Sequence, residues 1–188
     1  MGEQEQQLWR LLEPVYPQVV AFARHLSRSR SDGDDLFQEA VVRAMAKLRD
    51  LRDEAAFKAW MYRIVITVHR NRCRRAFWLR FIQLGGQSES GEDAHVSGDY
   101  RVAEWSPDAA EASRRIRDAL ASLPAVQREA IVLFEIEGWR VEEIATLHGI
   151  SVSTVKSRLA RGRARLREHY EAAGATQGIP TLVSGDTR

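Results

Sequence analysis

Apolar residues recur along the chain at steps of three and four positions, and no stretch shows the strict alternation of a half-buried strand. The pattern predicts a first helix that bends or restarts where Pro14 and Pro17 interrupt it. A second helix is expected to begin near Ser31 or Asp32, where a capping side chain and further acids suit a helix N-terminus. A third helix is expected over residues 55–75. The chain is therefore predicted to be all-α.

Each of these helices has one apolar stripe that must be buried against a partner. The third helix is expected to bury Trp60, Ile64 and Val68, which would place Tyr62 on its exposed side. Helices with complementary stripes and short connections pack together. Residues 1–81 are therefore interpreted as one small helical domain.

The pattern changes abruptly over residues 82–111, where glycine, serine and proline replace the apolar periodicity. Seven acids in this stretch face a single base, Arg101, so it is interpreted as a flexible acidic linker. Helical periodicity resumes over residues 112–170, with a break at Pro124. Residues 171–188 are interpreted as a flexible tail.

The spacing within VEEIATLHGISVSTVKSRL, residues 141–159, is typical of a helix-turn-helix. Ala145 supplies a small side chain where two helices cross, and Gly149, four residues later, tolerates the positive φ of the turn. Ser151 can cap the second helix. The second domain is therefore predicted to carry a DNA-binding motif on its last helix.

The last helix holds six basic side chains between Val152 and Arg167. At 100° per residue, Val152 shares its buried stripe with Val155, Leu159, Gly162 and Leu166. The opposite face is a small, polar crest between two basic flanks, which suits base reading in a major groove with phosphates held at the edges. The predicted DNA-binding residues are Ser153, Thr154, Lys156, Ser157, Arg158, Arg161 and Arg165. A solvated basic helix is the simpler alternative.

A second basic surface is predicted on the third helix, because residues 55–88 contain no acid. Seven Lys and Arg residues alternate there with aromatic ones, including Tyr62, Phe77, Trp78 and Phe81. Aromatic rings beside arginines suit unpaired bases, whose faces a duplex hides. The alternative is that these aromatics belong to the core and the arginines are only solvated.

Composition narrows the function further. The net charge is only +2, from 28 Lys+Arg and 26 Asp+Glu, so any nucleic-acid surface must come from patterning. A single cysteine, Cys73, excludes an intramolecular disulfide. The N-terminal residues lack the pattern of a signal peptide, and no apolar run approaches the length of a membrane span. The five histidines lack ligand spacing, and no catalytic motif is present. We therefore expect a cytoplasmic protein that is not an enzyme and uses no metal, cofactor or small-molecule substrate.

Three segments together resemble the extracytoplasmic-function sigma factors of bacterial RNA polymerase: DDLFQEAVVRAMAKL, FKAWMYRIVITVHRNRCRR, and LPAVQREAIVLFEIEGWRVEEIATLHGISVSTVKSRLARGRARLRE after the acidic linker. The resemblance implies a sigma region 2-like helical bundle and a sigma region 4-like helix-turn-helix domain. It also implies binding to core RNA polymerase, recognition of the −35 element as duplex, recognition and melting of the −10 element, and control by an anti-sigma factor.

The resemblance assigns roles to particular residues. The polymerase-binding face corresponds to Asp35, Leu36, Gln38 and Glu39. The −10 region, including the melted non-template strand, is expected to contact Tyr62, Arg63, Thr67, Arg70, Asn71 and Arg74. Two of these, Thr67 and Asn71, stand where family members often carry an asparagine and an aspartate.

Two other classes of binding protein fit parts of the pattern. An ordinary helix-turn-helix repressor or activator would dimerise on palindromic DNA and need no polymerase. A protein built on sigma-like domains could instead sequester a regulator. The basic, aromatic third helix favours the sigma factor, because a repressor has no use for single-stranded DNA.

Overall fold

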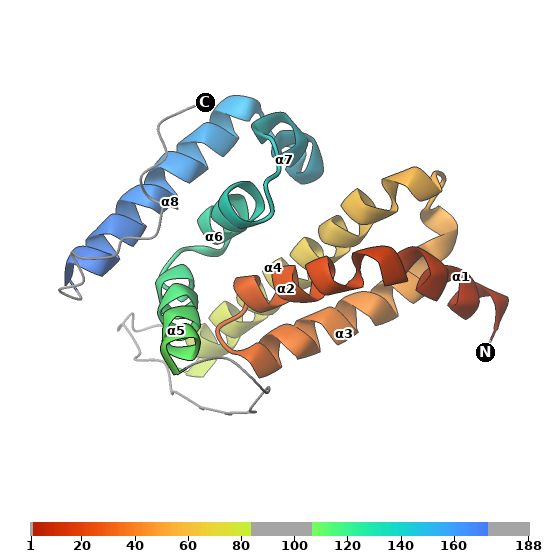
Figure 1. Cartoon of the computed structure of the whole chain (residues 1–188), viewed down its shortest axis with the longest axis horizontal. Helices are drawn as coiled ribbons and strands as arrows, with labels where there is room; N and C mark the ends of the chain where they lie inside the picture. The colour runs from red at the N-terminus through yellow and green to blue at the C-terminus, as the bar shows by residue number, and fades with distance from the viewer. Residues whose placement is uncertain (1, 84–106, 173–188) are drawn as a thin grey trace.

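The computed structural model describes residues 2–83 and 107–172, and every regular element in these ranges is helical (Figure 1). This confirms the predicted all-α class. The first half contains α1 (Glu3–Leu12), η1 (Glu13–Val15), α2 (Tyr16–Leu26), α3 (Arg30–Lys47), η2 (Leu48–Asp50), η3 (Glu54–Ala56) and α4 (Phe57–Gln83). The second contains α5 (Pro107–Ala121), α6 (Ala125–Ile131), η4 (Val132–Ile136), α7 (Val141–His148) and α8 (Val152–Ala172).

The N-terminal bundle is built on the stripes that the sequence predicts. Leu8 and Leu12 of α1 and Phe22 of α2 have no exposed surface. Helices α2 and α3 cross at Gly33, where a Cβ atom would lie 2.6 Å from the Cα of Arg24. Because that neighbour is backbone, only a residue without a side chain allows this crossing.

The helix boundaries differ from the prediction in two places. The N-cap of α3 is Ser29, whose Oγ accepts a hydrogen bond from the Asp32 N–H at 3.0 Å. The helix therefore begins at Arg30, slightly before the expected start near Ser31 or Asp32. Helix α4 continues to Gln83, eight residues beyond the expected end at Arg75. The predicted restart near the first two prolines is confirmed, because η1 separates α1 from α2 there.

The second half begins earlier than expected, because α5 starts at Pro107 and the last residues of the predicted linker are helical. Pro124 ends the α5–α6 turn as predicted and occupies the N-cap of α6. Between α6 and α7, η4 is a π-helical turn in which the Glu137 N–H donates to the Val132 carbonyl at 3.0 Å. Residues 84–106 of the predicted linker and residues 173–188 of the predicted tail lie outside the described residues.

The two helical groups lie against each other, with α6 and α7 between the N-terminal bundle and α8 (Figure 1). Helices α2 and α4 make contacts with α6, and α4 also contacts α7. Helix α8 is therefore on the side of the second domain away from α4. This arrangement decides which of the predicted surfaces are open to solvent.

Candidate nucleic-acid interface

Helices α7 and α8 form the predicted helix-turn-helix. Gly149 ends α7 in the left-handed region, with φ of 64° and ψ of 40°. The next N–H, of Ile150, donates back to the Ala145 carbonyl at 3.0 Å, which closes the turn. Ser151 then caps α8, because its Oγ accepts from the Thr154 N–H at 3.2 Å. Gly149 and Ser151 therefore have the roles that the sequence indicated.

The buried side of α8 matches the predicted stripe. Val155, Leu159 and Leu166 are buried, and Val152 is partly buried. At Gly162, α8 crosses α6 so closely that a Cβ atom would lie 2.8 Å from the Cγ1 of Ile131. This crossing fixes α8 on its domain and turns its opposite face outward.

The predicted crest of α8 faces solvent. Ser153, Ala160, Arg161 and Ala164 are exposed, and Ser157 is partly exposed. The Arg161 Nη2 donates to the Ser157 Oγ at 2.6 Å, so these two side chains lie side by side on the crest. A polar, small-residue surface of this kind can enter a major groove without steric conflict.

The basic residues around the crest divide into free and engaged groups. Lys156 and Arg165 are exposed, which leaves them available for phosphates. Arg163 instead forms an ion pair with Glu135 at 2.6 Å, and both side chains are mostly buried. Arg158 turns inward, where its Nη1 lies 3.3 Å from the Nδ1 of His148, and Thr154 is partly buried.

The predicted −10 residues follow one face of α4. Arg63, Thr67, Arg70 and Arg74 are spaced by four, three and four residues, so they share a face. Arg63, Thr67 and Arg74 are exposed, and Arg74 donates to the Asn71 side chain at 2.9 Å. The hydroxyl of Thr67 donates to the Arg63 carbonyl of its own helix at 2.7 Å.

Tyr62 is a correction, because its side chain is fully buried rather than exposed. Its ring stacks on Phe22, with centroids 4.6 Å apart, and packs against Trp139 at 5.1 Å. Its hydroxyl donates to a Glu137 carboxylate oxygen at 2.6 Å. Burial, followed by this hydrogen bond, raises the pKa of the Tyr62 hydroxyl well above its ordinary value. The second domain therefore covers the side of α4 that the sequence had suggested was open.

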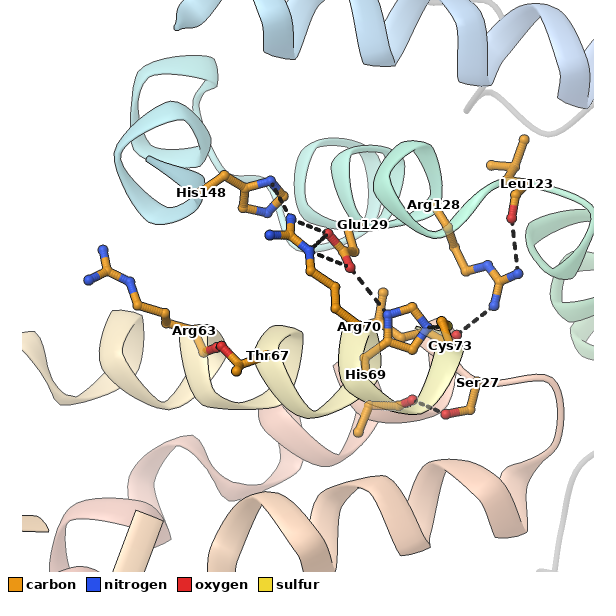
Figure 2. Close-up of polar contacts among 12 residues, drawn as sticks. Ser27, Arg63, Thr67, His69, Arg70, Cys73, Leu123, Arg128, Glu129 and His148 are labelled. Atoms are coloured by element: carbon orange, nitrogen blue, oxygen red, sulfur yellow. Dashed lines mark hydrogen bonds and ion pairs between the residues drawn. The ribbon is translucent and has the colours of Figure 1, made fainter. Parts of the chain in front are cut away.

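The centre of this covered face is an ionic cluster shown in Figure 2. Glu129 of α6 has no exposed surface, and its carboxylate accepts from the Arg70 guanidinium at 2.9 and 2.5 Å. His69 Nδ1 lies 3.2 Å from the other oxygen of Glu129. His148 of α7 completes the cluster, with its Nδ1 3.2 Å from Arg70 Nη2. Residues of α4 and of the second domain thus satisfy one another's charges across the contact.

The cluster shifts the pKa of its members in opposite directions. Burial opposes ionisation of Glu129, but hydrogen bonds from His69 and Arg70 outweigh it and lower the pKa of the carboxyl. Burial likewise opposes charge on His69, but hydrogen bonds with Cys73 and Glu129 raise its pKa. Burial lowers the pKa of His148 to about 4, assisted by Arg70 and Arg158 and opposed by Glu129. His148 is therefore a neutral acceptor near pH 7, placed between two guanidinium groups.

Two further contacts join the domains beside the cluster. The Arg63 Nη2 donates to the Thr146 carbonyl of α7 at 3.3 Å. Arg128 of α6 is buried and donates to the Leu26 carbonyl at the end of α2 at 2.7 Å. The same guanidinium also donates to the carbonyls of Ala121 and Leu123. Arg128 therefore satisfies backbone acceptors that would otherwise be left open at helix ends in both domains.

The face expected to bind polymerase is mostly open. Asp35 and Gln38 of α3 are exposed, and the Glu39 carboxylate forms ion pairs with Arg43 and Arg72, both at 2.8 Å. Leu36 is a correction, because its side chain is completely buried in the bundle core and has no surface to offer a partner. Its place in the apolar stripe of α3 explains this burial.

The aromatic end of α4 does not belong to the core. Phe77, Trp78 and Phe81 are each more than half exposed, at 66%, 56% and 52%. Trp78 and Phe81 pack edge to face, with centroids 5.9 Å apart. The alternative that these rings are buried core residues is therefore wrong for this part of the helix.

Sequence reasoning missed the residues that hold the two domains together. Glu129 is an acid directly before the apolar run Ala130 to Leu133, and His148 is a polar residue beside the glycine of the turn. A charged residue at a position where the helical period requires burial is a signal that it has a buried partner. The partner itself lies 59 residues away in the sequence and could not be identified from spacing.

Within residues 2–83 and 107–172, no helix has both the length and the apolar character needed to cross a membrane.

Comparison with known proteins agrees with the two-domain arrangement. Residues 11–79 match the family model of sigma-70 region 2, and residues 113–166 match that of sigma-70 region 4. A curated relative is the ECF RNA polymerase sigma factor SigM of Mycobacterium tuberculosis, which is 33% identical over 157 residues, covering 84% of this chain and 74% of the relative.

Two solved structures have a similar fold. The sigma factor RpoE of Bartonella quintana, in complex with the anti-sigma factor NepR, aligns with a TM-score of 0.58 and 27% identity, over 92% of this chain and 98% of that one. CnrH in complex with the cytosolic domain of CnrY aligns with a TM-score of 0.58 and 26% identity, over 89% of this chain and 90% of that one. Taken with the geometry of the two domains, these matches show that the chain belongs to the extracytoplasmic-function sigma factors, which bind core RNA polymerase and direct transcription initiation at promoters.

Proposed function

We propose that α8 reads the −35 element as duplex DNA through its exposed crest, with Arg161 and Ser157 at base edges and Lys156 and Arg165 on phosphates. The observation that carries this assignment is the division of α8 into a buried stripe and an outward polar crest, with the exposed bases Lys156 and Arg165 at its edges. Arg158 holds phosphate in this proposal only after it leaves His148. Ser153 and Thr154, at the start of α8, lie where recognition helices approach the groove.

The −10 element is assigned to the face of α4 that carries Arg63, Thr67, Arg70, Asn71 and Arg74. Three of these residues are exposed, and no acid occurs on this helix to repel phosphate. Tyr62 stacks on an unpaired base only if the second domain moves away, because Trp139 and Glu137 occupy its ring and hydroxyl here. The exposed aromatic rings at the end of α4 offer further stacking surface beside Arg74.

The polymerase contact is assigned to a polar face of α3, on which Asp35 and Gln38 are exposed and Glu39 is held by ion pairs with Arg43 and Arg72. Leu36 supports this face from beneath. An anti-sigma factor is the second expected partner, since the solved structure of RpoE is a complex with an anti-sigma factor. The protein acts on polymerase in the cytoplasm in this proposal. The promoter-binding units correspond to residues 1–81 and 112–170, each extended slightly by the observed ends of α4, α5 and α8.

The division of labour on α8 is tested with two variants of the full chain. The duplex preferred by the wild-type chain with core polymerase is first selected from a random DNA pool. Replacing Arg161→Ala is expected to cost about 1–3 kcal/mol on that duplex and less on a scrambled one, because a base contact is lost. Replacing Arg165→Ala is expected to weaken both duplexes equally and to reduce the salt slope by about 0.9, because one phosphate contact is lost.

Binding is measured across a salt series for both variants and both duplexes. Equal losses from the two substitutions on both DNAs would show that α8 is an electrostatic clamp and that sequence is read elsewhere. A chain that selects no duplex, with or without polymerase, would overturn the −35 assignment altogether.

A further inference from the structure

Cys73 on α4 carries the only thiol of the chain, and neither of the proposed DNA surfaces uses it. Its residue is exposed, so a small solute can reach the sulfur from solvent. It precedes Arg74 directly and follows Arg70 by three positions, which places it at the edge of the α4 face assigned to the −10 element. An ordinary cysteine is mostly protonated near pH 7, so the surroundings of this thiol decide whether it reacts.

Two further side chains connect the thiol to a buried acid (Figure 2). The Cys73 Sγ lies 3.5 Å from the Nε2 of His69, one helical turn earlier on α4. The other ring nitrogen, Nδ1, lies 3.2 Å from a carboxylate oxygen of Glu129, which has no exposed surface. When Nδ1 donates to that carboxylate, Nε2 is left as the acceptor for the thiol proton. A thiol, an imidazole and a carboxylate in this order can convert a cysteine to its nucleophilic thiolate form.

Arg128 of α6 is a second, independent feature of the same place. Its side chain is only 7% exposed, and Figure 2 shows its guanidinium beside Cys73 and His69. The two terminal nitrogens of Arg128 donate to carbonyl oxygens at helix ends, whereas its Nε has no hydrogen-bond partner among the described residues. A buried donor without an acceptor is unfavourable. A thiolate, or an oxygen atom added to the sulfur, is the kind of acceptor that this donor lacks.

These neighbours lower the pKa of the Cys73 thiol. The hydrogen bond with His69 is the main cause, and the charges of His69 and Arg128 add to it, against burial and the charge of Glu129. Burial opposes charge on His69, but the hydrogen bonds with Cys73 and Glu129 raise its pKa. A thiolate beside an imidazolium is therefore favoured more than in an isolated cysteine.

We propose that Cys73 is a site of reversible oxidation by hydroperoxides, and that its modification weakens the binding of the melted strand to α4. The thiolate sulfur attacks the hydroxyl oxygen of the hydroperoxide, so a sulfur–oxygen bond forms as the oxygen–oxygen bond breaks. His69 donates its Nε2 proton to the departing oxygen, which leaves as water or an alcohol. The sulfur loses two electrons and becomes a sulfenic acid, and the peroxide gains them.

The sulfenic acid cannot form an intramolecular disulfide, because the chain has no second cysteine. It condenses instead with a low-molecular-weight thiol, which releases water and leaves a mixed disulfide, and a second thiol restores Cys73 by exchange. An acidic adduct such as glutathione places bulk and negative charge beside Arg70 and Arg74, where it repels the phosphates of a bound strand. This consequence rests on the assignment of single-strand binding to α4 made under the proposed function, whereas the chemistry of the thiol does not.

The reactivity of the thiol is measured on the full chain, folded and unfolded in guanidinium chloride, so that the same cysteine is its own control. Alkylation of Cys73 by iodoacetamide, followed by mass spectrometry from about pH 6 to pH 9.5, should have a lower midpoint in the folded chain. Hydrogen peroxide at pH 7, with dimedone to trap the sulfenic acid, should react about threefold to tenfold faster with the folded chain. The larger thiolate fraction outweighs the lower nucleophilicity of a less basic thiolate. An unchanged midpoint or an unchanged oxidation rate would overturn the proposal.

The variant His69→Gln separates activation by the imidazole from simple exposure of the thiol. Its side chain can form hydrogen bonds but cannot take up the thiol proton, so its alkylation midpoint should move to that of the unfolded chain. Circular dichroism establishes that its helices are intact. A folded His69→Gln chain with the wild-type midpoint would refute the role of His69. If this variant does not fold, the comparison of folded and unfolded wild type still decides the proposal.

The effect on DNA binding is measured separately with a labelled oligothymidylate of about 12 nucleotides, because stacking does not depend on sequence. The chain with glutathione on Cys73 should bind it more weakly than the reduced chain, with a salt slope smaller by about 0.7 for one lost phosphate contact, and dithiothreitol should restore both. The matched control, Cys73→Ser after the same glutathione treatment, should bind like the reduced wild type.

Two outcomes of this measurement contradict different statements. Unchanged binding by the chain that carries glutathione would overturn the proposed effect of the modification on α4. A reduced wild-type chain that binds no oligothymidylate would instead refute the assignment of single-strand binding to α4. The alkylation and oxidation measurements judge the thiol chemistry in either case, because they involve no DNA.

Discussion

Acidification should open the contact between the two domains through His148. This side chain is a neutral acceptor between Arg70 of α4 and Arg158 of α8, with Glu129 of α6 as the nearby acid. Its pKa is lowered to about 4, mainly by burial, in the closed chain, in which the two domains are in contact as in this structure. In an open chain, in which the domains have separated, the pKa of His148 is expected near the ordinary value of about 6.5. The open chain therefore binds a proton more readily, and falling pH favours it between about 6.5 and 4.

The size of the effect follows from these two values. When the pH falls from 6.5 to 5, the free energy of closure becomes less favourable by about 1.6 kcal/mol, since each unit of pKa corresponds to about 1.36 kcal/mol. This is an upper limit, because Arg158 belongs to the same domain as His148 and keeps its pKa slightly low after opening. A loss of about 1 kcal/mol is therefore expected, which is roughly a fivefold change in the ratio of closed to open chains.

The other members of the cluster do not cancel this effect. The raised pKa of His69 stabilises closure fully below about 6.5, and that contribution is lost only as the pH rises through the raised value. The lowered pKa of Glu129 stabilises closure above its ordinary value of about 4.3, and that contribution is lost only at lower pH. Closure should therefore be strongest near neutrality and should weaken on both sides.

The assay is X-ray scattering of the full chain from pH 7.5 to pH 5, with circular dichroism to follow the helices. The variant His148→Gln retains a hydrogen-bond acceptor but cannot take up a proton, so it should expand less than the wild type on acidification. The matched control is His169→Gln on the last turn of α8, which should behave like the wild type. Equal expansion of the wild type and His148→Gln would refute the reasoning, as would a wild type that stays compact at pH 5.

Two further substitutions test the packing that positions the DNA-binding surfaces. Gly149→Ala should destabilise the full chain by about 1–2 kcal/mol in urea denaturation, because φ at this position is 64°. No atom lies within 4 Å of the new Cβ, so backbone strain is the only cost. Gly149→Asn should destabilise the chain less, and an equal or larger loss of stability would contradict this explanation. Gly33→Ala should lower stability by about 1–2 kcal/mol in the same assay, because contact with the Arg24 backbone at 2.6 Å outweighs the roughly 1 kcal/mol that alanine gains in a helix. A net gain in stability would show that α2 and α3 separate easily.

Local patterns in the sequence predicted the parts of the fold that depend on local contacts. The buried stripe of α8, the left-handed Gly149 and the Ser151 cap each follow from residues within one or two turns. Leu36 lies four residues before Ala40 and is buried with it, so helical spacing is a better guide to this residue than the polymerase-binding role drawn from the family resemblance. These features need no knowledge of distant segments.

Tyr62 could not be placed correctly from its own helix. A single stripe assumes that a helix packs on one side, but α4 packs against α2 and α3 and is also covered by α6 and α7. The ring of Tyr62 therefore lies between Phe22 of one domain and Trp139 of the other. The same limit applies to Arg70, whose carboxylate partner lies across the domain boundary. What the sequence could not supply was the docking of one domain on the other.

The contact between the domains depends on the exact number of residues in the π-helical turn η4. A π turn contains about one residue more than an α turn, so it rotates everything that follows by roughly 100° relative to an uninterrupted α-helix. Glu137 and Trp139 come directly after it and reach Tyr62 in that rotated position. Deleting one residue between Val132 and Ile136 would leave both side chains in the sequence while turning them away from their partner. Insertions and deletions in this segment could therefore tune how readily the domains separate, without changing any residue that touches DNA.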